Sequence, residues 1–552
     1  MKTTYKARLA AFCLLAACSA VIYSCGKPLD GIDVIVTTGA LSKSPTLVQF
    51  VNSNSDSPTP IPTSIDVTIG GPDKALVQTE DGGSTTFKAT NGHLAISLSR
   101  KANPTTTNPV VFTVSASPTG YVPVLKTFTI TSDTAKLIVK LPLVEITRPG
   151  DGIAYVAQNL ALTSGTSAAS STTITVPTRT DAPQSASLNI AASTQMKDAS
   201  GAAVSATSLS YNIVHYGTGS AEANSAFPGG FMPTNVIGAD DKIISQLAFY
   251  NAGTLSIRMT AGTTAVKSFS KPVNVTIEIS KTLINPTTGR AVAIGDAIPI
   301  WSRDETTGQW KNEKSTGVIA ESAGKFYVTF PITHLSDWGL MWSSPVANFI
   351  PNFIGPQVPF FQGYQINASI YNQVFMNLIN PFGSFNVPSL TFPTGFGSIG
   401  LTLFSNFGDP TVPVFQSEVN PASQGTVNIT VPTPTVEYIA ADITLVGKCT
   451  SKQVVAYPST WITVTDVTDV TDLTESPVYA TDGKISTSFI SGHTYKATTT
   501  YNGKTRTTAA FKVDKTTNLS INGTEGLTGT AVYDAVSGRL KVDATFTVGT
   551  CN

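Results

Sequence analysis

Asn91-Gly92-His93-Leu94-Ala95-Ile96-Ser97-Leu98 is the stretch of sequence that decides the fold class. Its first two residues are a strong turn signal, because Asn-Gly favours the tight turn of a β-hairpin. The residues that follow place apolar side chains at alternate positions, which predicts a strand with one buried face. Residues 65–69, Ile-Asp-Val-Thr-Ile, alternate in the same way. These patterns predict paired β-strands and a buried layer between sheets.

The same pattern continues along the chain. Turn residues interrupt period-two hydrophobicity roughly every 8 to 12 positions, which is the spacing of an antiparallel sandwich. Asp482-Gly483 and Asn502-Gly503 repeat the hairpin signal near the C-terminus. Only residues 240–251 suggest a helical turn or two. Strands are predicted at 110–114, 125–130, 172–177, 186–193, 209–216, 254–260, 273–279, 326–332, 443–446, 461–464, 485–489, 494–501 and 540–548.

Composition agrees with an all-β chain and excludes some functions. Of 552 residues only 13 % are charged, and 35 basic side chains balance 35 acidic ones. No long-range field would attract nucleic acid to such a surface. The length accommodates roughly three to five domains. We therefore predict several antiparallel β-sandwich domains in tandem.

The first residues have the order of an export signal. Lys2, Lys6 and Arg8 precede an uncharged apolar run at 9–23, and Ser24-Cys25-Gly26-Lys27 follows. The run would span about 22 Å as a helix, too short for a bilayer core of about 30 Å. Bacterial lipoprotein signals end at a cysteine in this way, so we predict cleavage before Cys25 and lipidation of its sulfur. Cys18 is the alternative cleavage site.

Stable anchoring follows from such a modification, because two or three acyl chains hold a protein to a membrane where one does not. The mature chain would carry a net charge of −3. Gly26 follows the modified cysteine where Asp would retain a lipoprotein in the inner membrane, so the outer membrane is expected. The body would face the periplasm or the medium.

Cys449 and Cys551 are the cysteines left for the folded body. Export leads to an oxidising compartment, so a disulfide between them is predicted. It would staple the two ends of the last domain, and two free buried thiols are the alternative. The predicted organisation is a signal peptide at 1–24, an N-terminal sandwich at 25–146, a Trp-motif β domain at 147–342, a Phe-rich β domain at 343–437 and a C-terminal sandwich at 438–552.

Three motifs carry a family resemblance. The segments 295–301 (Gly-Asp-Ala-Ile-Pro-Ile-Trp), 304–310 (Asp-Glu-Thr-Thr-Gly-Gln-Trp) and 333–342 (Thr-His-Leu-Ser-Asp-Trp-Gly-Leu-Met-Trp) resemble a module of Bacteroidetes surface lipoproteins. Related modules resemble the extracellular domain shared by cartilage intermediate layer protein and the FAM171 family. The resemblance implies a sandwich with tryptophans packed inside or at an edge, a structural hydrogen bond for His334, and no catalytic residue.

The last domain is similar to carboxypeptidase-regulatory or transthyretin-like sandwiches. Strand spacing, Asp482-Gly483-Lys484 and the pattern at 495–501 carry that similarity. Such modules are accessory and non-catalytic, which is what the similarity implies here.

Catalytic motifs are not found in the sequence. His93, His215, His334 and His493 lie too far apart for a local zinc pair. No Gly-x-Ser-x-Gly elbow or phosphate-binding glycine loop occurs, and Ser322-Ala-Gly-Lys325 is better explained as a hairpin turn than as a catalytic Ser-x-x-Lys. Carboxylate pairs at 240–241 and 304–305, and Asp466, Asp469 and Asp472, are interpreted as edge charges, with calcium binding by the last set as the alternative. We expect no metal or cofactor.

Aromatic side chains are the remaining candidates for ligand contact. Trp301, Trp310, Trp338, Trp342 and Trp461 could stack on sugar rings if exposed, although core packing is the default for the first four. We predict possible ligand contacts at Trp301, Trp310, Trp342 and Trp461. The domain at 343–437 holds more phenylalanines than a small core needs, so some are expected to face a partner or to close a seam between domains.

The sequence thus predicts a non-catalytic, lipid-anchored cell-envelope protein that presents β-sandwich modules for adhesion or for assembly with other envelope proteins. Its partners would be the membrane, through the lipid, and an envelope protein or a glycan, but not nucleic acid. The alternative is a glycan- or nutrient-binding surface lipoprotein that uses exposed aromatics. A hydrolase whose site is assembled from distant residues is a third hypothesis.

Overall fold

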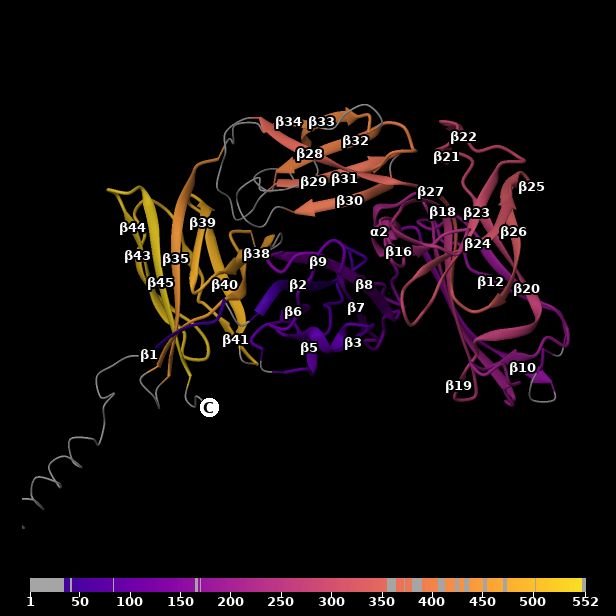
Figure 1. The fold of residues 1–552 in the computed structure, drawn as a ribbon, viewed down its shortest axis with the longest axis horizontal. Helices are drawn as coiled ribbons and strands as arrows, with labels where there is room; N and C mark the ends of the chain where they lie inside the picture. The colour runs from indigo at the N-terminus through magenta and orange to yellow at the C-terminus, as the bar shows by residue number, and fades with distance from the viewer. Residues whose placement is uncertain are drawn as a thin grey trace, which may run out of the picture.

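Figure 1 shows the computed structural model of the chain, which is nearly all β. The structure describes residues 34–39, 42–82, 84–163, 167–168, 170–354, 364–371, 373–379, 390–405, 413–421, 426–430, 436–449, 454–469, 474–501 and 503–548. The predicted signal peptide, Cys18 and Cys25 lie outside these residues. The prediction of several β-sandwiches in tandem is confirmed.

The first sandwich contains the hairpin that Asn91-Gly92 predicts. Asn91 (φ 49°) and Gly92 (φ 79°) both adopt the positive φ of a type I′ turn, and Thr90 pairs with His93 across it. The sheet order is β8-β7-β3-β5-β6-β2-β9, with β4 beside β6. The strands are β2 (Ser42–Asn52), β3 (Ser64–Gly70), β4 (Val77–Thr79), β5 (Phe87–Thr90), β6 (His93–Ser99), β7 (Val110–Ala116), β8 (Val124–Ile130) and β9 (Leu137–Leu143).

The second sandwich packs a sheet of ten strands against a sheet of six. The ten are β10 (Ile153–Thr163), β11 (Ser167–Ala168), β15 (Ser208–Tyr216), β16 (Thr234–Ile237), β17 (Ile243–Gln246), β18 (Ala248–Ala261), β19 (Thr264–Ala265), β23 (Ala297–Arg303), β24 (Trp310–Val318) and β27 (Asp337–Ser344). The six are β12 (Thr172–Val176), β13 (Ala186–Ile190), β14 (Met196–Lys197), β20 (Ser268–Ile279), β25 (Ala320–Ser322) and β26 (Lys325–His334). A separate hairpin joins β21 (Ile284–Asn285) to β22 (Arg290–Ala291).

Helices are short within the described ranges. The α-helix α2 (Ala221–Ala226) begins where the Ser220 hydroxyl accepts a hydrogen bond from the N–H of Ala223 at 3.0 Å, and η2 (Lys74–Leu76) is a 3₁₀ turn. No helix in the described part of the chain is both long and apolar enough to span a bilayer. The helical turn suggested at 240–251 is wrong. That segment enters β17, which pairs with β16, and the start of β18, which pairs with β27, because strand pairing outweighs local preference.

The third sandwich shares its core with the second. Phe349, Phe392 and Phe396 belong to the same buried cluster as Trp342, which fits the expectation that some phenylalanines close a seam. Phe360, Phe361, Phe382, Phe385 and Phe407 lie outside the described residues. The strands are β28 (Val346–Ile354), β31 (Leu390–Pro393) and β34 (Thr426–Thr430) in one sheet, and β29 (Tyr364–Ile370), β30 (Gln373–Ile379), β32 (Ile399–Ser405) and β33 (Pro413–Val419) in the other.

The last sandwich has a sheet ordered β1-β36-β35-β45-β44-β43, with β39 beside β35, and a sheet ordered β38-β37-β40-β41, with β42 beside β40. The strands from its own stretch of chain are β35 (Tyr438–Cys449), β36 (Val454–Tyr457), β37 (Thr460–Asp466), β38 (Thr474–Ala480), β39 (Lys484–Ile490), β40 (Thr494–Tyr501), β41 (Lys504–Thr507), β42 (Phe511–Lys512), β43 (Asn518–Asn522), β44 (Thr528–Asp534) and β45 (Arg539–Val548). Asp482-Gly483 forms its turn at positive φ, but the strands on either side enter different sheets after one bridge, Thr481 to Lys484.

The edge strand of that sheet comes from the other end of the sequence. β1 (Val34–Thr37) runs parallel to β36, with Val34 opposite Val454 and Thr37 opposite Tyr457. The N–H of Gly39 donates to the Asp482 carboxylate at 2.9 Å and extends the attachment. The first described residues therefore belong to the last sheet and not to the first sandwich. The domain boundaries drawn from the sequence stay a prediction.

The order of the sandwiches in space differs from their order in the chain. In Figure 1 the first sandwich lies between the last and the second, and the third lies above the first. Two seams therefore flank the first sandwich, one on each side. Both contain buried ionisable side chains, and these define the candidate sites.

Candidate functional site

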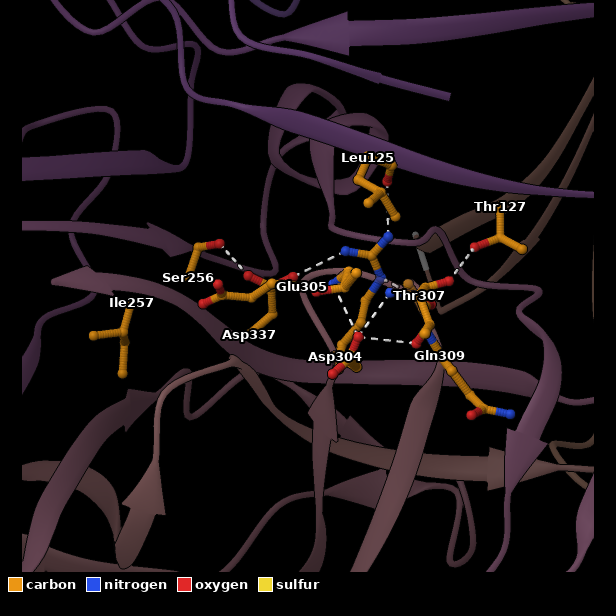
Figure 2. Close-up of polar contacts among 12 residues, drawn as sticks. Leu125, Thr127, Ser256, Ile257, Asp304, Glu305, Thr307, Gln309 and Asp337 are labelled. Atoms are coloured by element: carbon orange, nitrogen blue, oxygen red, sulfur yellow. Dashed lines mark hydrogen bonds and ion pairs between the residues drawn. The ribbon is translucent and has the colours of Figure 1, made fainter. Parts of the chain in front are cut away.

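The seam between the first and second sandwiches contains a buried ion-pair network. Arg303, at the end of β23, and Asp337, at the start of β27, are register partners and are 3 % and 1 % exposed. The Arg303 Nη1 lies 3.0 Å from Asp337 Oδ2, and the Arg258 Nη2 lies 2.9 Å from Asp337 Oδ1. Ser256 donates a further hydrogen bond to the same carboxylate, as Figure 2 shows. Burial alone would raise the pKa of Asp337, but the two arginines outweigh it and hold the pKa below its usual value.

Arg303 also joins the two sandwiches. Its Nη2 donates to the backbone carbonyl of Leu125 in β8 at 2.7 Å, and its Nε donates to that of Gly308 at 3.2 Å. Beside it, the Thr127 hydroxyl donates to the carbonyl of Thr307 at 3.1 Å (Figure 2). One guanidinium therefore neutralises a buried carboxylate and holds a strand of the neighbouring sandwich.

The turn at 304–308 is shaped by its first residue. Asp304 Oδ1 accepts hydrogen bonds from the N–H groups of Thr306 and Thr307 and from the Thr307 hydroxyl, so the shape of the turn is fixed (Figure 2). The next residue, Glu305, pairs with Arg258 at 3.2 Å and with Lys267 at 2.8 Å. The sequence predicts edge charges at 304–305. In the structure, the Asp304 carboxylate stabilises the turn, and the Glu305 carboxylate forms ion pairs at the seam.

A cleft of about 460 Å³ opens along this seam and is lined by both sandwiches. Its walls include Lys126 of β8 and the Gly229-Gly230 pair, both of whose glycines have positive φ. Lys126 is half-buried, and its Nζ has a carbonyl contact to Gly229 at 3.5 Å. Burial and the nearby charge of Arg303 lower the pKa of Lys126 to about 8. The positive charge of Lys126, at the wall of the cleft, is thus balanced only weakly by its long contact to the Gly229 carbonyl.

The opposite seam joins the first sandwich to the last. Glu80 is 7 % exposed, and its Oε2 accepts from the Thr460 hydroxyl at 2.9 Å and from the N–H of Trp461 at 3.2 Å. Its Oε1 is buried without a hydrogen-bond partner in the part of the chain that the structure describes. Burial raises the pKa of Glu80 to about 8, although the two hydrogen bonds oppose the shift. A small apolar cluster of Leu47, Trp461 and Tyr479 adjoins it.

The tryptophans proposed as ligand contacts are buried, which corrects that prediction. Trp301, Trp310, Trp338, Trp342 and Trp461 are between 0 % and 4 % exposed. The Trp301 Nε1 donates to the carbonyl of Met341 at 3.0 Å, and Trp310 packs between Phe227 and Phe249 with ring centroids 5.8 Å and 5.7 Å away. Their rings fill the second core, and that of Trp461 fills the seam to the last sandwich, so no face is free for a sugar.

The four histidines lie in separate places, and each has a local structural contact or is buried. A hydrogen bond of 3.1 Å joins His334 Nδ1 to Ser336 Oγ, and the His334 ring packs on Trp338. Both contacts agree with the structural role that the resemblance implies. Burial lowers the pKa of His215 to about 4. His493 contacts Asp466 at 2.7 Å, and His93 contacts Gln49 at 3.2 Å.

Other motifs singled out in the sequence also have structural explanations. Ser322 and Lys325 are register partners across a tight turn whose Ala323 and Gly324 have positive φ, so the hairpin interpretation of this motif is confirmed. Within the described ranges, no group of three or more His, Cys, Asp or Glu side chains could hold a metal ion. Asp472 of the predicted acidic set lies outside the described residues.

Cys449, at the end of β35, is disulfide-bonded. Its predicted partner Cys551 lies outside the described residues, so the identity of the pair stays a prediction.

Lys126, Arg258 and Glu80 were not identified from the sequence. Lys126 did carry a signal, because it interrupts the alternating apolar series of Val124, Phe128 and Ile130 at an inward position. A charge at such a position indicates a partner from elsewhere in the fold. Glu80 and Arg258 lie in segments without such a signal.

No protein-family model matches the chain. Among solved structures, it is similar to the C-terminal fragment of the pilus adhesin SpaC from Lactobacillus rhamnosus GG, with 12 % identity, 38 % of this chain and 99 % of that chain covered, and a TM-score of 0.15. A streptococcal ancillary pilin matches with 10 % identity, 47 % and 95 % coverage and a TM-score of 0.13. The full-length major pilin SpaD from Corynebacterium diphtheriae matches with 7 % identity, 92 % and 97 % coverage and a TM-score of 0.14. At these TM-scores the similarities carry no argument.

Proposed function

We propose that the protein is a non-catalytic, lipid-anchored cell-envelope protein that presents connected β-sandwiches for adhesion or for assembly with other envelope proteins. The observation that carries the proposal is the use of its buried ionisable side chains. Arg303 and Asp337 join the first sandwich to the second, and Glu80 joins the first to the last. Ionisable groups that a catalytic site would present to a substrate here connect the sandwiches.

Attachment of the N-terminal segment to the last sandwich supports the anchoring part of the proposal. β1 begins nine residues after Cys25. A fully extended stretch of nine residues reaches about 30 Å. Lipidation of Cys25 would therefore hold the last sandwich close to the bilayer, and the second sandwich would lie at the far end of the molecule (Figure 1). Gly26 supports the outer membrane as the destination.

The sugar-binding alternative, in the form that uses exposed tryptophans, has lost the residues that supported it, since those rings are buried. We therefore do not propose aromatic stacking as the mode of ligand contact.

The anchoring part of this function is tested by mass spectrometry of the mature protein from wild-type cells and from Cys25→Ser and Cys18→Ser variants. We expect the wild type and Cys18→Ser to begin at an acylated Cys25, and Cys25→Ser to retain its signal peptide. A mature end without fatty acid would refute the anchor.

The presentation of the body is tested separately on intact cells. Protease treatment should remove the sandwiches from the surface if they face the medium and leave them intact if they face the periplasm. Chemical cross-linking before lysis should then capture an envelope partner in wild-type cells at a higher yield than in Cys25→Ser cells. Equal yields would contradict an assembly role that depends on the anchor.

A further inference from the structure

We propose that the cleft between the first and second sandwiches binds an acidic sugar, with Lys126 contacting the carboxylate of the ligand. This site is distinct from the aromatic contacts considered above. The proposal stands on the cleft alone and does not depend on lipid anchoring or on the cellular location of the protein.

The charge of the lining favours an anion. Four cationic side chains, Lys126, Lys140, Arg258 and Arg303, line the cleft, whereas Glu305 and Asp337 are the acidic ones. Both oxygens of Asp337 are occupied by arginines, and both oxygens of Glu305 are occupied by Arg258 and Lys267. The carboxylates are thus fully paired, and the lining keeps two surplus positive charges. An entering anion would find no free carboxylate to repel it.

Lys126 is the cation best placed to bind such a ligand. It has no carboxylate within 4.0 Å among the described residues, and its carbonyl contact to Gly229 at 3.5 Å is long for a hydrogen bond. A half-buried ammonium in this state has lost water without gaining a counter-charge. A ligand carboxylate would supply that counter-charge, which agrees with the lowered pKa of the free side chain.

Hydroxyl groups also line the cleft, beside apolar side chains, and make it suitable for a saccharide. Thr68, Thr113, Ser115 and Ser117 contribute from the first sandwich, and Ser225 and Thr306 from the second. Hydroxyls both donate and accept hydrogen bonds, as sugar hydroxyls do. The volume of about 460 Å³ lies within the range of small-molecule sites. A neutral sugar would use these groups but leave Lys126 uncompensated, so specificity for an acidic sugar follows.

The experiment is isothermal titration calorimetry of the full chain at pH 7 with D-glucuronate, D-glucose and acetate as separate probes. We expect glucuronate to bind at least tenfold more tightly than either of the others, because a charge-assisted hydrogen bond corresponds to about tenfold or more in affinity. Lys126→Met should weaken glucuronate binding at least tenfold, and Lys126→Arg should retain it. Lys101→Met, which removes an exposed cation from the same sandwich, should have no effect.

Three results would overturn the proposal: no heat of binding for glucuronate at millimolar concentrations, equal binding of glucose or acetate, or undiminished binding by a folded Lys126→Met variant. A measurement on the wild type keeps the test valid if that variant does not fold. Since the pKa of free Lys126 is about 8, binding at pH 8 should take up about half a proton, measured by titration in buffers of different ionisation enthalpy. At pH 6 the uptake should vanish, and equal uptake at both pH values would refute a role for Lys126.

Discussion

Replacing Glu80 with Gln should stabilise the seam between the first and last sandwiches at alkaline pH and leave it nearly unchanged at pH 5. Glu80 is buried against Thr460 and Trp461, and one of its oxygens has no hydrogen-bond partner among the described residues. Gln keeps the shape and one acceptor oxygen but cannot ionise. The variant therefore removes the charge without removing the contacts to β37.

The magnitude follows from the pKa. Burial raises the pKa of Glu80 from 4.5 to about 8, so the native state holds a proton that the unfolded state releases between these values. Stability of the wild type then decreases as pH rises through this window and is fully present only below pH 4.5. Each pKa unit corresponds to about 1.4 kcal/mol, so the total loss is at most about 5 kcal/mol. The measured loss of stability is smaller if the seam opens before the chain unfolds, because opening exposes Glu80 to water.

Hydrogen exchange of the β37 peptide that contains Trp461 measures this seam directly, because several sandwiches in one chain do not unfold as a single two-state unit. We expect wild-type and Glu80→Gln exchange to agree at pH 5 after correction for intrinsic rates. At pH 9 the wild-type peptide should exchange at least tenfold faster than the variant. Asp66→Asn, which neutralises a carboxylate 92 % exposed on β3 of the same sandwich, should follow the wild type at both pH values.

The reasoning would be refuted if Glu80→Gln accelerated exchange in β37 at pH 9, since that result would mean that the ionised carboxylate stabilises the seam. Identical exchange of the wild type and the variant across the whole pH range would show that Glu80 does not change its ionisation within the window.

Three further substitutions test other parts of the structure. Asp337→Asn should destabilise the second sandwich by about 3–5 kcal/mol, measured by hydrogen exchange of the β27 peptide, because it leaves Arg303 buried without its carboxylate. Asp240→Asn, on an exposed turn, is the control, and equal exchange in both variants would contradict the network. Gly92→Ala should destabilise the first sandwich by about 1–3 kcal/mol, since φ is +79° and the new Cβ would lie 2.7 Å from the Phe50 carbonyl oxygen; Gly120→Ala also has positive φ but open space around it, and thermal unfolding should separate the two. Cys449→Ser should lower the stability of the last sandwich by about 2–5 kcal/mol, and a reducing agent should lower the melting temperature of the wild type but not of the variant.

Local features of the fold could be predicted because their causes are local. Asn91-Gly92 specifies a turn through the φ angles that these residues tolerate, and the alternation at 65–69 reappears as buried Ile65 and Val67 with exposed neighbours. The helical prediction at 240–251 is wrong because strand pairing overrides the weak helical pattern there: β17 pairs with the neighbouring β16, and the start of β18 pairs with β27, which is distant in sequence.

The seams could not be predicted, since they join segments hundreds of residues apart. β1 and β36 pair in parallel, and nothing in the sequence of either strand identifies the other as its partner. Glu80 acquires its environment only when Thr460 and Trp461 are placed beside it. Residue type alone made the tryptophans possible ligand contacts, with core packing as the default for all but Trp461, and the structure shows that all five are buried.

The pairing of β1 with β36 determines how mechanical load would pass through the molecule. Tension on the N-terminal segment reaches the sheet of the last sandwich through β1 before it reaches the first sandwich. The load therefore passes through hydrogen bonds to the last sandwich, more than 400 residues further along the chain, and not first through the backbone that leads to the first sandwich. Detachment of β1 would transfer the pull to the first sandwich and lengthen the tether, so this strand is the first link to bear the load.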